Sequence, residues 1–233
     1  MLIRSGLTGI AILALQPIAN WPLVRNVYRR LRPPGSSDER TFLGACIKCG
    51  QCVQVCPVNA ITFADLNEGF GSGAPYIDAR AQACDFSCDA LSCILACPTG
   101  ALTHEIHSKE EVKIGMARLA RPDTCLARSA KGFVGTTRGP DFPGRIRDEA
   151  IDRWNAVRVS EHPYDREICD LCVLECPIGE NAIKLVPLAD SSIPGAMTPV
   201  VGDGCVGCGV CQMVCPAEPT CIVVDPFGEE IAV

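Results

Sequence analysis

Cysteine is the residue type in this sequence whose number and spacing most clearly indicate chemistry. The 233 residues include 17 cysteines, and most of them fall in four short bursts. Cysteines grouped this closely share a metal centre more readily than they form disulfides, which usually connect scattered cysteines in short secreted chains. Zinc is a weaker alternative, because none of the three histidines stands at a zinc-finger distance from a CxxC pair. The bursts therefore predict metal centres held by sulfur ligands.

The first and last bursts have the spacing with which bacterial ferredoxins hold [4Fe–4S] clusters. In that spacing three close cysteines bind one cluster, and a fourth, followed by proline, binds another. The two-residue gaps let a tight loop surround one cluster, and the longer step starts a helical turn that directs the fourth thiolate away. Gly50 and Gly209 lie inside these loops, where the backbone needs a positive φ or a close approach. The two runs are Cys46, Cys49, Cys52, Cys56 and Cys205, Cys208, Cys211, Cys215.

The second and third bursts vary this spacing. The second keeps four cysteines and a final Cys-Pro but has longer gaps, whereas the third has only three cysteines. Counting back by the usual gap from the third burst leads to Arg166, which cannot bind iron. Cys125 and Cys221 are the two cysteines left to supply the missing ligand. The cysteines of these bursts are Cys84, Cys88, Cys93, Cys97 and Cys169, Cys172, Cys176.

Of these two candidates, Cys125 is the predicted ligand and Cys221 the predicted non-ligand. Cys221 stands at the start of a predicted strand, where other units have the small residues Ala60 and Ala101. A free cysteine at such a position often behaves as a small buried apolar residue. Cys125 follows a short segment, 116–120, of the kind that leads into other cysteine loops. We therefore expect sixteen cysteine ligands and four [4Fe–4S] clusters.

Around the bursts the sequence repeats one unit four times: strand, cysteine loop, helical turn, Cys-Pro and a trailing strand. The trailing strands are predicted at residues 60–64, 101–104, 182–186 and 221–224. Two such units make a two-cluster ferredoxin fold, so the expected class is α+β with two ferredoxin-like modules. Only 5% of the residues are aromatic, which leaves few large side chains to fill a core. We therefore expect the clusters to hold the modules together.

The chain divides into two expected regions, an N-terminal apolar segment (residues 1–31) and a four-cluster polyferredoxin domain (32–233). An insertion at about residues 126–168 interrupts the third unit and contains several glycines, prolines and a predicted helix over 148–157. Insertions of this length are surface excursions or carry a function of their own. The sequence supports two interpretations equally, a simple excursion and a docking surface for a partner with Trp154 as its anchor.

The N-terminal segment is expected to associate with a membrane. Residues 6–24 form an uncharged stretch whose length is close to the minimum for a membrane span. Pro17, Asn20 and Pro22 interrupt its second half. An apolar helix here would serve as a signal or anchor, lie in the interface, or dock on a membrane partner. The arginines that follow favour the cytoplasmic side by the positive-inside bias, and they would equally bind anionic headgroups. The net charge of −6 and the lack of a basic patch argue against nucleic acid as a partner.

Spacing alone leaves open which units share clusters. The layout resembles the iron–sulfur subunits of molybdopterin oxidoreductases, and this resemblance implies that the first unit pairs with the fourth and the second with the third. The implied ligand groups are Cys46, Cys49, Cys52 with Cys215; Cys205, Cys208, Cys211 with Cys56; Cys84, Cys88, Cys93 with Cys176; and Cys125, Cys169, Cys172 with Cys97.

Several stretches of the chain resemble the NapG/MauM group of ferredoxin-type proteins. They are the apolar N-terminus, Arg32-Pro33-Pro34-Gly35, the first cysteine run, residues 97–102, and residues 123–127, which support Cys125 as a ligand. The resemblance covers about residues 32–225. It implies that the protein relays electrons between a membrane-embedded, quinol-oxidising partner and another redox protein, and it favours the periplasmic face of the membrane. The flanking arginines leave the cytoplasmic face as the alternative.

The predicted function is electron transfer without catalysis, as one subunit of an oxidoreductase complex in a respiratory chain. Clusters with four cysteine ligands keep no iron position open for a substrate. The chain also has no glycine-rich dinucleotide loop, P-loop or CxxxCxxC run. One alternative is the iron–sulfur subunit of a molybdopterin-type or other multisubunit oxidoreductase. The other, from a different class, is a zinc-bound structural protein.

Overall fold

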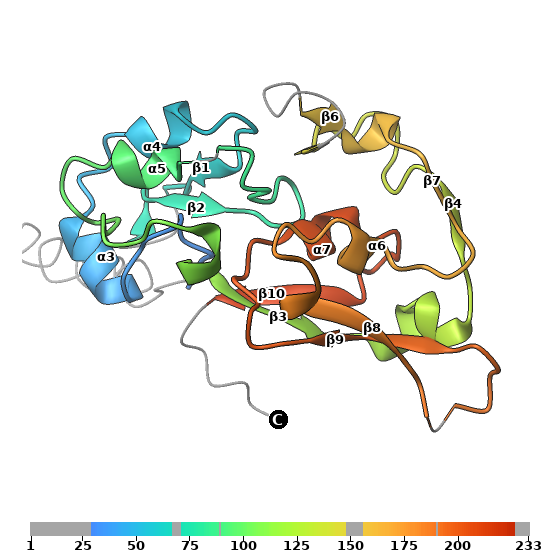
Figure 1. The fold of residues 1–233 in the computed structure, drawn as a ribbon. Helices are drawn as coiled ribbons and strands as arrows, with labels where there is room; N and C mark the ends of the chain where they lie inside the picture. Colours follow the sequence, from blue (N-terminus) through green and yellow to red (C-terminus); the bar gives the residue numbers. More distant parts are fainter. Residues whose placement is uncertain (1–28, 67–70, 89, 148–155, 190, 227–233) are drawn as a thin grey trace, which may run out of the picture.

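Figure 1 shows the fold in a computed structural model, which describes residues 29–66, 71–88, 90–147, 156–189 and 191–226. The expected apolar helix lies outside the described residues. So do Trp154 and most of the helix expected over 148–157, whose last residue, Val157, belongs to a strand. In the described parts of the chain, no helix is both long enough and apolar enough to cross a bilayer.

Each of the four cysteine loops leads into a short helix, as the repeated unit predicts. These helices are α4 (Gln51–Gln54), α5 (Ser92–Leu95), α6 (Leu171–Leu174) and α7 (Val210–Val214). Gly50 and Gly209 precede α4 and α7 with φ of +78° and +91°, the left-handed conformation that glycine adopts without steric cost. One further helix, α3 (Glu39–Ala45), precedes the first loop and is capped by the Asp38 carboxylate.

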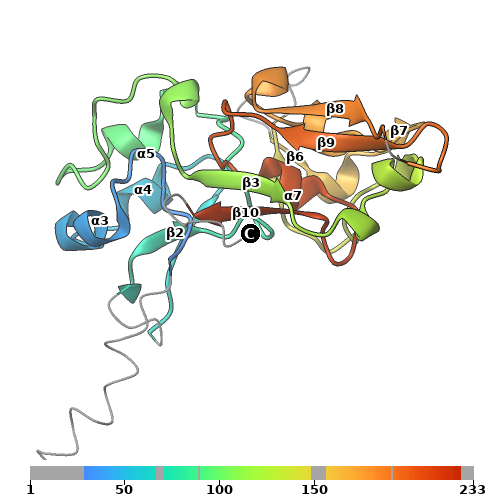
Figure 2. The ribbon, with the colours of Figure 1, turned by 90° about the horizontal axis from the view of Figure 1, so that it is seen from below.

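The strands form short antiparallel ladders between units that are neighbours in the sequence. Strand β1 (Ile61–Phe63) pairs with β2 (Pro75–Ile77), which leads into the second unit. Strand β8 (Ile183–Pro187) pairs with β9 (Met197–Val201), and β10 (Ile222–Pro226) pairs with β3 (Gly115–Leu119). In Figure 2 the ladders β8–β9 and β3–β10 lie together on one side of the molecule, and α3, α4 and α5 lie on the other.

Strands form at three of the four predicted trailing positions, and the prediction is wrong at residues 101–104. There, Leu102 makes a single bridge to Ser36, and the Thr103 N–H donates to the Gly35 carbonyl at 2.8 Å. The partner segment begins with two prolines, Pro33 and Pro34, which have no N–H to donate to a ladder. The pairing is therefore limited to a bridge.

The described part of the insertion at 126–168 is folded onto the rest of the protein. Strand β4 (Phe133–Gly135) pairs with β7 (Tyr164–Arg166), and β5 (Arg145–Ile146) pairs with β6 (Val157–Arg158). The Gln82 side-chain amide exchanges two hydrogen bonds with the Arg145 backbone, at 2.7 and 2.9 Å. Ile146 and Val159 are buried and belong to the hydrophobic core.

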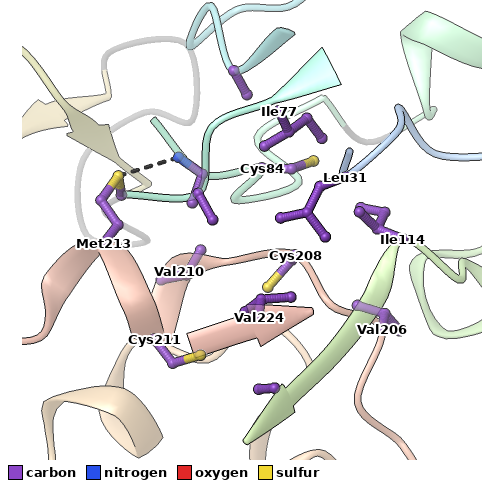
Figure 3. Close-up of a cluster of buried hydrophobic side chains, with 14 of the residues drawn as sticks. Leu31, Ile77, Cys84, Ile114, Val206, Cys208, Val210, Cys211, Met213 and Val224 are labelled. Carbon is purple, nitrogen blue, oxygen red and sulfur yellow. Dashed lines mark hydrogen bonds between the residues drawn. The ribbon is translucent and has the colours of Figure 1, made fainter. Parts of the chain in front are cut away.

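The two sides of the molecule meet in a tightly packed region around the second and fourth cysteine loops (Figure 3). The Cys84 N–H donates to the Cys208 carbonyl at 3.0 Å, and the Ala83 N–H points at the Met213 sulfur at 3.3 Å. Most buried side chains here are cysteine, alanine, valine and isoleucine rather than aromatic residues. The core therefore depends on close backbone approach and on the cysteine loops themselves.

Candidate iron–sulfur cluster sites

The structure gathers the cysteines into four groups, named sites A to D. Sites A, C and D each line a cavity, and in site B burial and neighbouring cysteines raise the pKa of Cys56, Cys84 and Cys93. Site A is Cys46, Cys49, Cys52 and Cys97; site B is Cys56, Cys84, Cys88 and Cys93; site C is Cys176, Cys205, Cys208 and Cys211; site D is Cys125, Cys169, Cys172 and Cys215, with Cys221 beside them.

This grouping corrects the pairing that the molybdopterin-subunit resemblance implied. The first unit shares sites with the second through Cys97 and Cys56, and the third shares sites with the fourth through Cys215 and Cys176. The reason lies in the ladders. Because β1–β2, β8–β9 and β3–β10 join units that follow one another in the chain, each Cys-Pro turn is brought to its neighbour's loop.

Positive φ angles recur at the same places in the first and last cysteine loops. Lys48 and Gly207, each in the middle of a CxxC, have φ of +57° and +71°. Together with Gly50 and Gly209 they make the chain curl around the site, and loops of this kind can present successive backbone N–H groups to a bound anion. Lys48 adopts this left-handed conformation although its side chain makes the conformation sterically unfavourable.

Backbone N–H groups point at cysteine sulfurs in several sites. The Ala60 N–H lies 3.2 Å from the Cys56 sulfur, and the Ala117 N–H lies 3.5 Å from the Cys205 sulfur. Burial alone would raise the pKa of Cys97, but N–H groups of Leu102 and Thr99 outweigh it and lower the pKa. Such donors are oriented to stabilise negative sulfur, which is what an anionic iron–sulfur cluster requires.

The composition of the cavities also fits an iron–sulfur cluster. Site C is walled by apolar side chains, including Ala182, Ile183 and Val224, so its cysteine sulfurs are the only strong metal ligands there among the described residues. Thiolates are the ligands that bind iron–sulfur clusters. In the described parts of the chain, no three His, Cys, Asp or Glu side chains are arranged to hold one metal ion.

Burial keeps most of these thiols protonated in the absence of metal. Burial, together with neighbouring cysteines, raises the pKa of Cys52 to about 11 and that of Cys208 to about 12. The pKa values of Cys84 and Cys211 are raised well above the usual range for the same reason. Iron binds thiolates, so cluster assembly must displace these protons and replace them with metal charge.

Site D contains five cysteines rather than four. Cys125 lies with the third burst, which agrees with its predicted role, and Cys221 lines the same cavity. The Cys221 sulfur is 3.5 Å from the Cys215 sulfur, and both residues are buried. Hydrogen bonding from the Cys221 thiol lowers the pKa of Cys125 and Cys215, and these two raise the pKa of Cys221. The sequence predicts only a packing role for Cys221, and nothing in the cysteine spacing indicates its contact with the predicted ligand Cys215.

The four sites follow one another in the order A, B, C, D. Cys52 of site A and Cys93 of site B interact electrostatically, as do Cys172 of site D and Cys211 of site C. Sites B and C are joined by the Cys84–Cys208 backbone hydrogen bond. Cys49 of site A is exposed, and its neighbour Ile47 is 63% exposed, so site A lies at the surface.

Comparisons with known proteins identify iron–sulfur domains in two cysteine-rich regions of the chain. Residues 45–101 match the family model described as a 4Fe-4S dicluster domain, which spans the two units that share sites A and B. Residues 202–218 match the model described as a 4Fe-4S binding domain. No solved structure matches the chain.

Curated relatives are similar over most of their length. The ferredoxin-type protein NapG of Escherichia coli (strain K12) is 34% identical over 203 residues, which are 85% of this chain and 71% of that protein. The methylamine utilization ferredoxin-type protein MauM of Paracoccus denitrificans is 33% identical over 201 residues, 85% of this chain and 72% of that protein. The resemblance found in the cysteine motifs is therefore confirmed, and the chain belongs to the NapG/MauM family of ferredoxin-type proteins.

Proposed function

We propose that this protein relays electrons through four [4Fe–4S] clusters, one at each of sites A to D, without catalysing a reaction of its own. The observation that carries the proposal is the succession of the sites: A and B, like C and D, are close enough to interact electrostatically, and a backbone hydrogen bond joins B to C. Electron transfer weakens steeply with distance, and contact between successive cysteine loops is the arrangement that a relay needs. Each cluster would supply one-electron chemistry when bound.

The proposed ligands are the sixteen cysteines of sites A to D without Cys221. Units one and two would form one ferredoxin-like module with sites A and B, and units three and four a second module with sites C and D. The ladder β1–β2 supports the first module, and β8–β9 with β3–β10 supports the second. The protein's own groups would hold the thiolates in place and direct N–H groups at the sulfurs.

The proposed partners are two redox proteins, one of them membrane-embedded and linked to quinol or quinone. Two features support this: the uncharged stretch at 6–24, and membership of the NapG/MauM family. We place the protein at the membrane, on the periplasmic face, with the cytoplasmic face as the alternative. Purification in mild detergent, followed by identification of bound subunits, tests this part. Recovery of a large cofactor-bearing catalytic subunit instead would favour a molybdopterin-type complex.

Metal analysis of anaerobically purified protein tests the cluster proposal itself. We expect about sixteen irons with matching acid-labile sulfide per chain, and broad visible absorption that bleaches on reduction. Zinc in place of iron, without visible absorption, would support the structural-protein alternative. About eight irons would mean that only one pair of sites is loaded.

A further inference from the structure

Cys221 stands at a position of the repeat that is alanine in the other three units. Ala60, Ala101 and Ala182 lie at the start of the chain segment that follows each Cys-Pro turn, and all three are buried. Cys221 occupies the corresponding place after Cys215 and is also buried. The exchange of alanine for cysteine therefore adds one sulfur to an otherwise repeated environment.

The Cys221 sulfur is directed at the site rather than at the core. It lies 3.5 Å from the Cys215 sulfur and lines the site D cavity together with Cys125. The backbone holds it there: the Cys221 carbonyl accepts from the Arg121 N–H at 3.0 Å, and the Arg121 guanidinium binds the Thr220 carbonyl at 2.8 Å. Because Arg121 is close in sequence to Cys125, these bonds tie both sides of the cavity together.

Five cysteine sulfurs line the site D cavity, whereas a [4Fe–4S] cluster would have only four irons for them to bind. Cys215 is followed by Pro216, as the corresponding cysteine of every other site is followed by proline. Cys169 and Cys172 form the loop that precedes α6 and enters it. Cys125 directly follows a helical turn ahead of its burst, as Cys46 does after α3. Cys221 shares none of these features and immediately precedes β10, so we take it to be the sulfur without an iron.

We infer that Cys221 is a positioning residue whose S–H donates a hydrogen bond to the Cys215 sulfur and raises the reduction potential of the site D cluster. The inference rests on the proposed function, because it requires a cluster at site D. A hydrogen bond to a ligand sulfur withdraws negative charge from the cluster, which favours the reduced, more negative state. Site D ends the succession of sites, so the bond would make this end a better electron acceptor.

The test is a redox titration of the anaerobic full-length protein, followed by electron paramagnetic resonance, with Cys221→Ala as the main variant. Alanine is what the other units carry, so the fold should tolerate it. We expect unchanged iron and sulfide content and a shift of one cluster to a more negative potential, with the others unmoved. Unchanged potentials would overturn the inference. Loss of about four irons would also overturn it, because Cys221 would then be a ligand.

A gain-of-thiol variant provides a matched second measurement. Ala182 lines site C together with Cys176, in the position that corresponds to Cys221 in site D. Ala182→Cys should therefore shift a different cluster to a more positive potential, and the double variant should show both shifts. An Ala182→Cys protein with full iron content and unmoved potentials would count against the mechanism. Absence of iron from the wild-type protein would instead refute the proposed function.

Discussion

Gly209 shows how closely the backbone must approach itself around the sites. Its φ is +91°, and a Cβ built there would lie 2.5 Å from the Ala79 Cβ and 3.5 Å from that of Ala83. Ala79 and Ala83 belong to the segment that leads into site B, whereas Gly209 belongs to the loop of site C. The missing side chain is therefore what lets the two loops touch.

Gly209→Ala should destabilise the loaded protein more than Gly100→Ala does. Both glycines have positive φ, at +91° and +70°, so both substitutions bring backbone strain. Only Gly209 also meets a neighbour, because nothing lies within 4 Å of a Cβ at Gly100. Overpacking adds about 1–3 kcal/mol. Guanidinium-induced loss of visible cluster absorption measures the difference, and equal midpoints for the two variants would disprove close contact between the loops.

The identity of the fourth ligand at site D can be tested with two serine variants. We expect Cys125→Ser to lose the site D cluster, about four irons, and Cys221→Ser to keep it. The physical reason is that Cys125 directly follows a short 3₁₀ turn, η3 (Pro122–Thr124), as Cys46 follows α3, whereas Cys221 immediately precedes β10. Iron and sulfide analysis of both proteins decides the question. The reverse result would exchange the two roles.

Helix α7 is held at its C-terminal end by side chains from other parts of the chain. The Arg80 guanidinium donates to the carbonyls of Gln212 and Cys215, at 2.7 and 2.9 Å, and pairs with Glu218 at 2.7 Å. Helix ends leave carbonyls without partners inside the helix, and a cation at the C-terminus satisfies them. Arg138 of the insertion donates to the Arg80 carbonyl at 3.1 Å. The insertion therefore supports the contact between the two halves.

Arg80→Ala should weaken the protein by about 1–3 kcal/mol, because it leaves part-buried carbonyls at the end of α7 without a donor. Arg40→Ala is the matched control, since Arg40 is exposed on α3. Thermal loss of cluster absorption should begin at a lower temperature in the Arg80 variant and be nearly unchanged in the control. Identical curves for the wild type and both variants would mean that Arg80 does not support α7.

Over the whole molecule, the core is built from small side chains and cysteines rather than from large aromatic ones. Buried residues such as Ala74, Ala83, Val210 and Val214 contribute little apolar area each, and many cysteines are buried with them. The raised pKa values of buried thiols such as Cys208 and Cys211 add a cost to forming thiolates without metal. Iron binding should therefore supply much of the folding free energy.

Removal of iron should unfold the described domain. We expect anaerobic chelation in the presence of a reductant to abolish the visible absorption and the near-ultraviolet circular dichroism together, since the same loops bind metal and form the core. Reconstitution with iron and sulfide should restore both signals. An iron-free protein that kept native circular dichroism and cooperative unfolding would show that the polypeptide core is sufficient.

The local features of this protein could be predicted from short stretches of its sequence. The cysteine spacing, the four helical turns after the loops, the positive φ at Gly50 and Gly209, and the family all follow from residues close together in the chain. Such features depend on local backbone geometry and on the ligand preference of iron. No strand forms at 101–104 because its partner segment contains prolines, which have no N–H for a ladder. Those prolines lie some seventy residues away, so the local sequence pattern does not reveal them.

Which units share sites, and where the Cys221 sulfur lies, depends on contacts between distant segments of the folded chain. Sharing depends on ladder hydrogen bonds such as those between β3 and β10, whose strands are more than a hundred residues apart, and spacing within a burst carries no information about them. The contact between Cys221 and Cys215 likewise depends on how β10 is anchored by Arg121. Motif spacing predicts local loops, whereas pairing between distant segments is decided when they pack.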